Sequence, residues 1–191
     1  MTKMPKRLNK ALFLDIDGVV VYDPGYLSRP EELCFLPNVT KSLKNAQNLS
    51  YLLIFISNKG GAFVKKGLTE EGLNVLDATF KVMLRDNGLD IKQLATFYCP
   101  HYPAKGEKCA CRKPRDGLFR QAIDKYNIDT TKSYVIGDKI SDLVPGVNLG
   151  CKKAFLVSRN SQKRINNEEV RSLFCCKYLN LFEVLKSLAI S

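Results

Sequence analysis

The 191-residue sequence contains no tryptophan, a single histidine and only three methionines. It also lacks any apolar run near the roughly 20 residues that a membrane-spanning helix needs. The first residues, MTKMPKRLNKALFLD, are basic, but their apolar segment is too short for a secretory signal peptide. We therefore expect a cytoplasmic protein with a single domain over residues 1–191, long enough to bury a core of its own.

Acidic residues are scarce relative to basic ones: 19 Asp and Glu stand against 30 Lys and Arg, a net charge of +11. Nucleic acid attracts such a charge, but the densest basic runs, KMPKRLNK and RNSQKR, contain no aromatic residue that could stack on bases. We expect a solvated basic surface that also attracts small anionic substrates. A nucleic-acid 3′-phosphatase or a basic binding module is the alternative from a different class.

The cysteine pattern argues against a disulfide framework. The chain has seven cysteines, an odd number, of which three lie between residues 99 and 111 and two are adjacent, at 175 and 176. Such a pattern fits metal binding or free thiols in a reducing compartment. We expect buried or free thiols at the four remaining positions, Cys34, Cys151, Cys175 and Cys176.

Short apolar runs alternate with helical patterns along the chain. The runs predict strands over residues 11–15, 51–58, 94–99, 133–138 and 153–158. Helices are expected between them, over residues 38–47, 69–88, 115–127 and 139–150, and residues 168–190 fit either short helices or a last strand and helix. This alternation predicts an α/β protein with a parallel sheet and helices on both faces.

Four residues mark the expected helix boundaries. Asn38 and Thr69 are suited to helix N-caps, and Gly88 to a left-handed C-terminal cap. Pro145 is expected to interrupt the helix over residues 139–150.

Polar, reactive residues follow three of the predicted strands. Asp15 and Asp17 follow the first, Ser57 and Asn58 end the second, and Asp138 ends the fourth. In open α/β sheets, sites form outside the carboxyl ends of the strands, so we expect these residues to meet in one crevice.

Four segments of the sequence each suggest a chemical role, but each is weak evidence when taken alone. The pair Asp15 and Asp17, with Gly18 behind it, can ligate Mg²⁺ or supply a nucleophile, although a turn with solvated acids is equally compatible. The sequence SNKGG, residues 57–61, predicts a glycine-rich turn that cradles phosphate oxygens. Lys113 precedes Pro114 and a helix start, and the segment GDKISDL places two acids around Lys139. Together and in this order, the four segments indicate phosphate chemistry.

In this order, FLDIDGVV, ISNKGG, CRKP and GDKISD resemble the four motifs of the haloacid-dehalogenase superfamily of phosphohydrolases. The segment YDPGYL and the pattern C-P-H…C-x-C-R-K-P narrow the resemblance to the heptose-1,7-bisphosphate 7-phosphatase family, with histidinol-phosphate phosphatases as close relatives. The resemblance covers residues 11 to about 158. It implies a Rossmann-like three-layer α/β/α core over about residues 10–160, a short zinc-bound loop over residues 99–111 and no large cap domain.

The resemblance also implies roles for individual residues. Asp15 would be the nucleophile, Asp17 the general acid and then the general base, and Ser57 and Lys113 would stabilise the transferring phosphoryl group. Mg²⁺ would be held by Asp15, Asp138 and the backbone carbonyl of Asp17. The implied substrate-binding residues are Asp23, Pro24, Gly25, Tyr26, Ser57, Asn58, Lys59, Gly60, Arg112, Lys113 and Lys139. Tyr26 is equally compatible with a role in packing only.

The implied reaction is removal of the C7 phosphate from D-glycero-D-manno-heptose 1,7-bisphosphate by a monomer, a step toward ADP- or GDP-heptose for bacterial surface glycans. Histidinol phosphate or another small phosphorylated metabolite remains the alternative substrate. The family more often has Gln-Ser where this sequence has Lys59 and Gly60, so the sugar contacts can differ here.

Cys99, His101, Cys109 and Cys111 offer three thiolates and an imidazole, a full tetrahedral zinc shell with no place for a catalytic water. We therefore expect structural zinc, against the alternatives of an unliganded loop or a redox pair, for which C-x-C lacks the usual spacing. With the single histidine used in this way, acid–base catalysis must depend on carboxylates.

Overall fold

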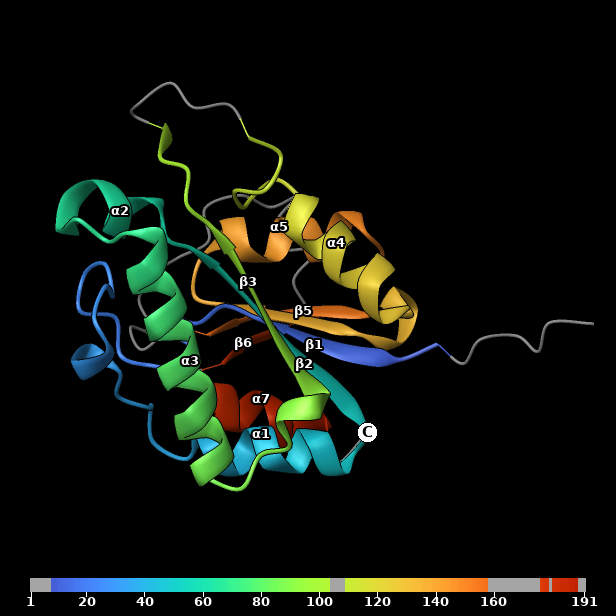
Figure 1. Ribbon diagram of the computed structural model, residues 1–191. Coiled ribbons are helices and arrows are strands. Elements are labelled where there is room, and N and C mark those ends of the chain that lie inside the picture. The colour runs from blue at the N-terminus through green and yellow to red at the C-terminus, as the bar shows by residue number, and fades with distance from the viewer. Residues whose placement is uncertain (1–7, 104–108, 158–175, 179, 189–191) are drawn as a thin grey trace, which may run out of the picture.

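Figure 1 shows the computed structural model, which describes residues 8–103, 109–157, 176–178 and 180–188. A six-stranded parallel sheet in the order β3-β2-β1-β4-β5-β6 crosses the molecule. The strands are β1 (Lys10–Leu14), β2 (Tyr51–Asn58), β3 (Leu94–Cys99), β4 (Tyr134–Gly137), β5 (Lys153–Val157) and β6 (Cys176–Tyr178). The five predicted strands are confirmed to within one residue at each end.

Helices cover both faces of the sheet (Figure 1). One face carries α1 (Val39–Asn48), α3 (Glu70–Asp86) and α7 (Leu181–Leu188), and the other carries α4 (Gly117–Tyr126) and α5 (Ile140–Asn148). Short 3₁₀ turns lie at η1 (Pro30–Glu32), η2 (Ile91–Gln93) and η4 (Thr130–Lys132). The predicted three-layer α/β/α architecture is therefore confirmed.

Each central strand is apolar throughout because it is covered on both sides. In β1, Leu12 and Leu14 face the α1, α3 and α7 layer, while Ala11 and Phe13 face α4 and α5. All four are at most 1% exposed, so the sheet centre is fully removed from water. Burial on both faces fixes the strands, and with them the positions of the residues that follow each strand.

The strand order creates one switch point, between β1 and β4. The chain runs from β1 to β2 through α1 and on to β3 through α2 (Gly60–Lys66) and α3, then returns to β4 through α4 and continues to β5 through α5. Connections on opposite faces diverge at such a point and leave a crevice at the carboxyl ends of the two strands. Asp15 follows β1 there, and Asp138 follows β4.

One helix was not predicted. The residues interpreted as a glycine-rich turn, 57–61, instead end β2 and begin α2 (Gly60–Lys66), with Lys59 at the N-cap position. A Cβ at Gly60 would lie 2.0 Å from the carbonyl oxygen of His101, so glycine lets this helix start against the cysteine loop. The turn prediction is wrong because this close approach, and not a turn, requires the glycine.

Two boundary predictions also need correction. Pro145 does not interrupt α5, which continues to Asn148, although proline cannot donate the bond to the residue four positions earlier. Asn38 occupies the N-cap of α1 as predicted, but its backbone is left-handed and its side chain makes no capping bond. Thr69 does cap α3, accepting a bond from the Gly72 N–H, and Gly88 adopts the expected positive φ of 82°.

The region after residue 157 is described in part. Residues 176–178 and 181–188 form a last strand and a last helix, the second of the two alternatives for this region. Residues 158–175, with Cys175, lie outside the described residues. Within the described chain, no helix combines the length and apolar character needed to cross a membrane.

Candidate active site

Residues from the ends of three strands, β1, β2 and β4, and from two loops line one cavity at the switch point. Its volume is about 460 Å³. The lining residues are Asp15, Asp17, Asp23, Gly25, Tyr26, Leu27, Ser57, Asn58, Lys59, Ala62, Arg112, Lys113, Lys139, Ser141 and Asp142. Of the predicted substrate-binding residues, only Pro24 and Gly60 are missing from this lining.

Asp15 and Asp142 share the ammonium group of a buried lysine. Lys113 Nζ lies 2.6 Å from Asp15 Oδ1 and 2.8 Å from Asp142 Oδ1, and it also donates to the Ile56 carbonyl at 2.6 Å. Lys113 is 4% exposed, so its charge is compensated by the two carboxylates and not by water. This arrangement holds the ammonium group of Lys113 in a fixed position beside Asp15.

Burial is the main cause of the raised pKa values of Asp15 and Asp138, the two acids that follow β1 and β4 at the switch point. Removal from water, aided by the charge of Asp142, raises the pKa of Asp15 to about 8 even though Lys113 opposes the shift. Burial likewise raises the pKa of Asp138 to about 6 against the effect of Lys139. A cation bound between the two acids would remove this cost of ionisation.

The same acids fit a metal ion. Ligand oxygens of Asp15, Asp138 and Asp142 lie within 4.8 Å of one another. Both oxygens of Asp142 are already used, one by Lys113 and one by the Lys139 backbone N–H at 3.0 Å. In contrast, Asp138 Oδ1 is buried without a hydrogen-bond partner among the described residues, and the Lys139 ammonium lies 3.7 Å away. Asp15 and Asp138 are therefore the better metal ligands.

Gly18 allows this approach of the two strand ends. Its φ is 88°, and a Cβ there would lie 2.9 Å from Asp138 Oδ2. A side chain at this position would push the acid of β4 away from the acids of β1.

Asp17 is held by donors from the end of β2. Ser57 Oγ donates to its Oδ2 at 2.8 Å, and Lys59 Nζ lies 2.9 and 2.8 Å from its two oxygens. Ser57 and Lys59 are 1% and 2% exposed. The sequence predicted Lys59 as a substrate contact; Lys59 lines the cavity, and its side chain contacts Asp17.

Asn58 binds the backbone of the lysine segment. Its Nδ2 donates to the Lys113 carbonyl and its Oδ1 accepts from the Lys113 N–H, both at 3.1 Å. This reciprocal pair joins the end of β2 to the segment that carries Arg112 and Lys113, and thereby fixes the backbone position of Lys113 beside the cavity.

A second group of cations lies at the rim of the cavity. Lys65 Nζ donates to Tyr26 Oη at 3.0 Å and lies 5.8 Å from the ring centre of Tyr102, while the Arg112 guanidinium lies 6.0 Å from that ring. The bond from Lys65 lowers the pKa of Tyr26. No carboxylate of the described residues lies within ion-pair distance of Lys65 or Arg112, so the rim offers positive charge to a ligand.

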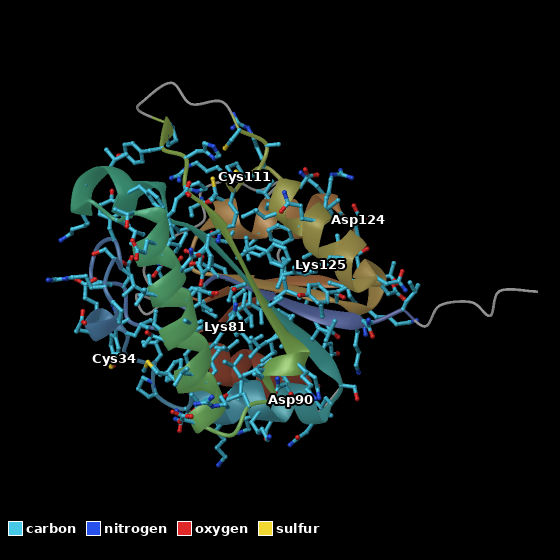
Figure 2. The ribbon with its side chains drawn as sticks, viewed as in Figure 1. Cys34, Lys81, Asp90, Cys111, Asp124 and Lys125 are labelled. Carbon is cyan, nitrogen blue, oxygen red and sulfur yellow. The ribbon has the colours of Figure 1, made fainter. Side chains whose placement is uncertain are left out.

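The four predicted zinc ligands meet in space. The ligand atoms of Cys99, His101, Cys109 and Cys111 lie within 4.8 Å of one another. The Cys99 sulfur lies 3.1 Å from the Cys111 sulfur and 3.8 Å from the Cys109 sulfur, whereas tetrahedral zinc–thiolate bonds impose roughly 3.8 Å between sulfurs. Figure 2 shows Cys111 near the start of α4, well separated from Cys34, a free exposed cysteine.

Comparisons with known proteins agree with this geometry. The HAD-hydrolase-like family model matches residues 110–179. The chain is 39% identical over 153 residues to D-glycero-beta-D-manno-heptose-1,7-bisphosphate 7-phosphatase of Haemophilus ducreyi, which spans 78% of this chain and 82% of that protein. The chain belongs to the heptose-1,7-bisphosphate 7-phosphatase family.

Two other members of the heptose-bisphosphate phosphatase family show the range of the similarity. The D-glycero-alpha-D-manno-heptose-1,7-bisphosphate 7-phosphatase of Photorhabdus laumondii is 36% identical over 78% of this chain and 82% of its own length. The crystal structure of D,D-heptose 1,7-bisphosphate phosphatase from B. bronchiseptica, complexed with magnesium and phosphate, has a TM-score of 0.79 and 26% identity, covering 95% of this chain and 98% of that one. The fold and the phosphatase class predicted from the sequence are thereby confirmed.

Two features of this family member were missed by sequence reasoning. Asp142 was seen only as a neighbour of Lys139, yet it holds Lys113. Lys65 and Tyr102 were not singled out at all, because an exposed lysine and a loop tyrosine give no distinctive signal. The spacing of Asp138 and Asp142 on either side of a helix start was the one available clue.

Proposed function

We propose that this chain hydrolyses the C7 phosphate of D-glycero-D-manno-heptose 1,7-bisphosphate through an aspartyl-phosphate. The observation that carries the proposal is the placement of Asp15: it is buried at the end of β1, contacts Lys113 and lines a cavity whose rim bears further cations. The names of the related proteins supply the substrate class.

The chemistry needs two carboxyl groups and no histidine. Asp15 attacks the phosphorus of the C7 phosphate, the bond from phosphorus to the sugar oxygen breaks, and Asp17 gives its proton to that oxygen. Asp17 then takes a proton from the water that attacks the aspartyl-phosphate, so that inorganic phosphate leaves and both groups are restored. The ammonium of Lys113, held 2.6 Å from Asp15 Oδ1, and the hydroxyl of Ser57 stabilise the phosphoryl group electrostatically as negative charge spreads over its oxygens.

Magnesium is part of this proposal. The residues that would hold it are Asp15, Asp138 and the backbone carbonyl of Asp17, and the unpartnered buried oxygen of Asp138 supports the fit. When bound, magnesium neutralises phosphate charge so that one anion can approach another.

Zinc is assigned a structural role at Cys99, His101, Cys109 and Cys111, whose clustering supports it. These four side chains would fill all four positions of a tetrahedral ion and leave none for substrate. The loop runs directly into Arg112 and Lys113, and Arg112 Nη1 donates to the His101 carbonyl at 3.1 Å. Ordering this loop therefore orders both cations.

The second phosphate of the substrate has a matching surface at the rim. Arg112 presents a planar donor fork, and Lys65 stands beside it without a carboxylate partner in the described part of the chain. A bisphosphate fits these cations better than histidinol phosphate, whose far end is a cationic amine.

A panel of phosphate esters tests the proposal. We expect kcat/KM for heptose 1,7-bisphosphate to exceed that for heptose 7-phosphate, histidinol phosphate and a DNA 3′-phosphate by about 10²-fold or more, with both anomers of the bisphosphate included. Asp15→Asn should abolish turnover while circular dichroism and the melting temperature stay near those of the parent. Preference for the DNA ester, or retained turnover in Asp15→Asn, would refute the proposal.

A further inference from the structure

Lys59 is one of two buried lysines in the part of the chain that the structure describes; the other is Lys113. A fully buried lysine is rare unless its charge is paired. Lys113 contacts Asp15, and Lys59 contacts Asp17, so each of the two acids has a lysine of its own. Of the two lysines, only Lys113 has a role in the chemistry described so far.

The ammonium of Lys59 has no donor left for a ligand. It lies 2.9 Å from Asp17 Oδ1, 2.8 Å from Asp17 Oδ2 and 3.5 Å from the Leu27 carbonyl oxygen. A lysine has three N–H donors and no acceptor, so these three oxygens account for all of them. A bond from the Lys59 ammonium to a substrate phosphate would require one of these three bonds to break, although Lys59 is only 2% exposed.

The backbone of Lys59 is fixed as firmly as its side chain. Its N–H donates to the Cys99 carbonyl at 2.8 Å, and its own carbonyl accepts from the Ala62 N–H at 2.8 Å at the start of α2. Lys59 is thus anchored to β3 on one side and to α2 on the other, and it reaches Asp17 from a rigid junction.

We infer that Lys59 is a positioning residue that sets the orientation of the Asp17 carboxyl group for proton transfer to the leaving oxygen. With Ser57 it places donors on both oxygens of Asp17, which fixes the plane of the carboxyl group. Proton transfer depends steeply on such geometry, and a small misplacement costs about 10²-fold in rate. The inference rests on the proposed function, in which Asp17 is the general acid.

The dependence of rate on the leaving group tests this role. A sugar alkoxide is a poor leaving group and needs the proton from Asp17, whereas 2,4-dinitrophenolate leaves without one. For Lys59→Met, which removes both the charge and the N–H donors, we expect kcat/KM to fall about 10²-fold with heptose 1,7-bisphosphate and less than about 3-fold with 2,4-dinitrophenyl phosphate. The ratio kcat/KM is the right quantity because it reports the first phosphoryl transfer and not the later hydrolysis.

Three further variants make the test specific. Asp17→Asn should show the same selective loss, and the double variant should be no slower than Asp17→Asn alone, since both changes remove one function. Lys59→Arg should recover part of the activity toward the sugar substrate. Lys66→Gln, the same charge change on an exposed lysine of α2, should leave both substrates unaffected.

An equal loss with both substrates, or an additive double variant, would overturn the inference and assign Lys59 to binding or to stability. If Lys59→Met does not fold, Lys59→Ala removes the same ammonium group with a smaller side chain, and the ratio of kcat/KM for the two substrates is measured on it. The proposed function is tested separately. Retained turnover in Asp15→Asn would refute the proposed function, whatever the ratio of kcat/KM for the two substrates in the Lys59 variants.

Discussion

Asp142 and Asp15 share the ammonium group of Lys113, at distances of 2.8 and 2.6 Å. The lysine therefore depends on Asp142 for its place beside the proposed nucleophile. The sequence indicated the lysine and both acids, but it could not indicate which acid holds the lysine and which oxygen stays free. That distinction depends on side-chain hydrogen bonds between β4, α5 and the segment before α4.

Asp142→Asn should lower kcat about 10- to 100-fold with a smaller change in KM, because Lys113 keeps its cation but loses a charged partner that aims it. The amide can still accept the bond from the Lys139 N–H, so α5 should stay intact. Steady-state kinetics and thermal unfolding measure the two effects. Asp116→Asn, on a half-buried acid outside the cavity that pairs with Arg120, is the control and should change neither.

The buried acids make stability depend on pH. Because burial raises the pKa of Asp15 to about 8, well above its ordinary value of 3.8, the magnesium-free folded protein binds a proton that the unfolded chain releases. This contribution to the free energy of unfolding is complete below about pH 4 and is lost as the pH rises toward 8. Denaturant titrations without added magnesium should show this decline.

Asp15→Asn should flatten that decline, since it removes the group that titrates. Added Mg²⁺ should stabilise the parent protein more at pH 8 than at pH 6, because metal binding requires ionised carboxylates. An unchanged pH dependence in Asp15→Asn would show that another group is responsible.

At the scale of elements, the strands were predictable and α2 was not. Strands buried on both faces are continuous apolar runs, a local property that the sequence displays directly. The sequence SNKGG has two glycines and low helix propensity, so the local signal favours a turn. Here the tertiary contact between Gly60 and the His101 carbonyl overrides propensity.

The cysteine loop and α2 meet at that contact, so zinc should influence the active site through the elements it orders. Cys109→Ser should lose zinc and most turnover together while the sheet and its helices survive, because the loop cannot bury enough apolar surface to order itself. Metal analysis, kcat/KM and circular dichroism measure the three effects. Cys34→Ser, at an exposed cysteine away from the site, should leave zinc content and turnover unchanged. Full kcat/KM in zinc-free protein would contradict the structural role.

At the scale of the whole molecule, the net charge of +11 acts on an anionic substrate before it reaches the cavity. We expect kcat/KM for the bisphosphate to fall several-fold between about 20 and 200 mM salt, and that for a monophosphate ester to fall less. Stopped-flow or steady-state rates at low substrate concentration measure this. Salt-insensitive rates would show that the basic surface does not steer the substrate.

The sequence by itself determined the α/β class, five of the strands and the family, and it singled out the acids, the lysine and the cysteines that the structure brings together. These follow from local patterns: buried strands are apolar, and reactive residues stand where strands end. Only the tertiary structure decided which oxygen of Asp138 lacks a hydrogen-bond partner among the described residues, that Asp142 holds Lys113, and that Lys59 contacts Asp17. Each of these depends on side chains far apart in the chain meeting in a buried site, where the direction of a hydrogen bond is set by packing.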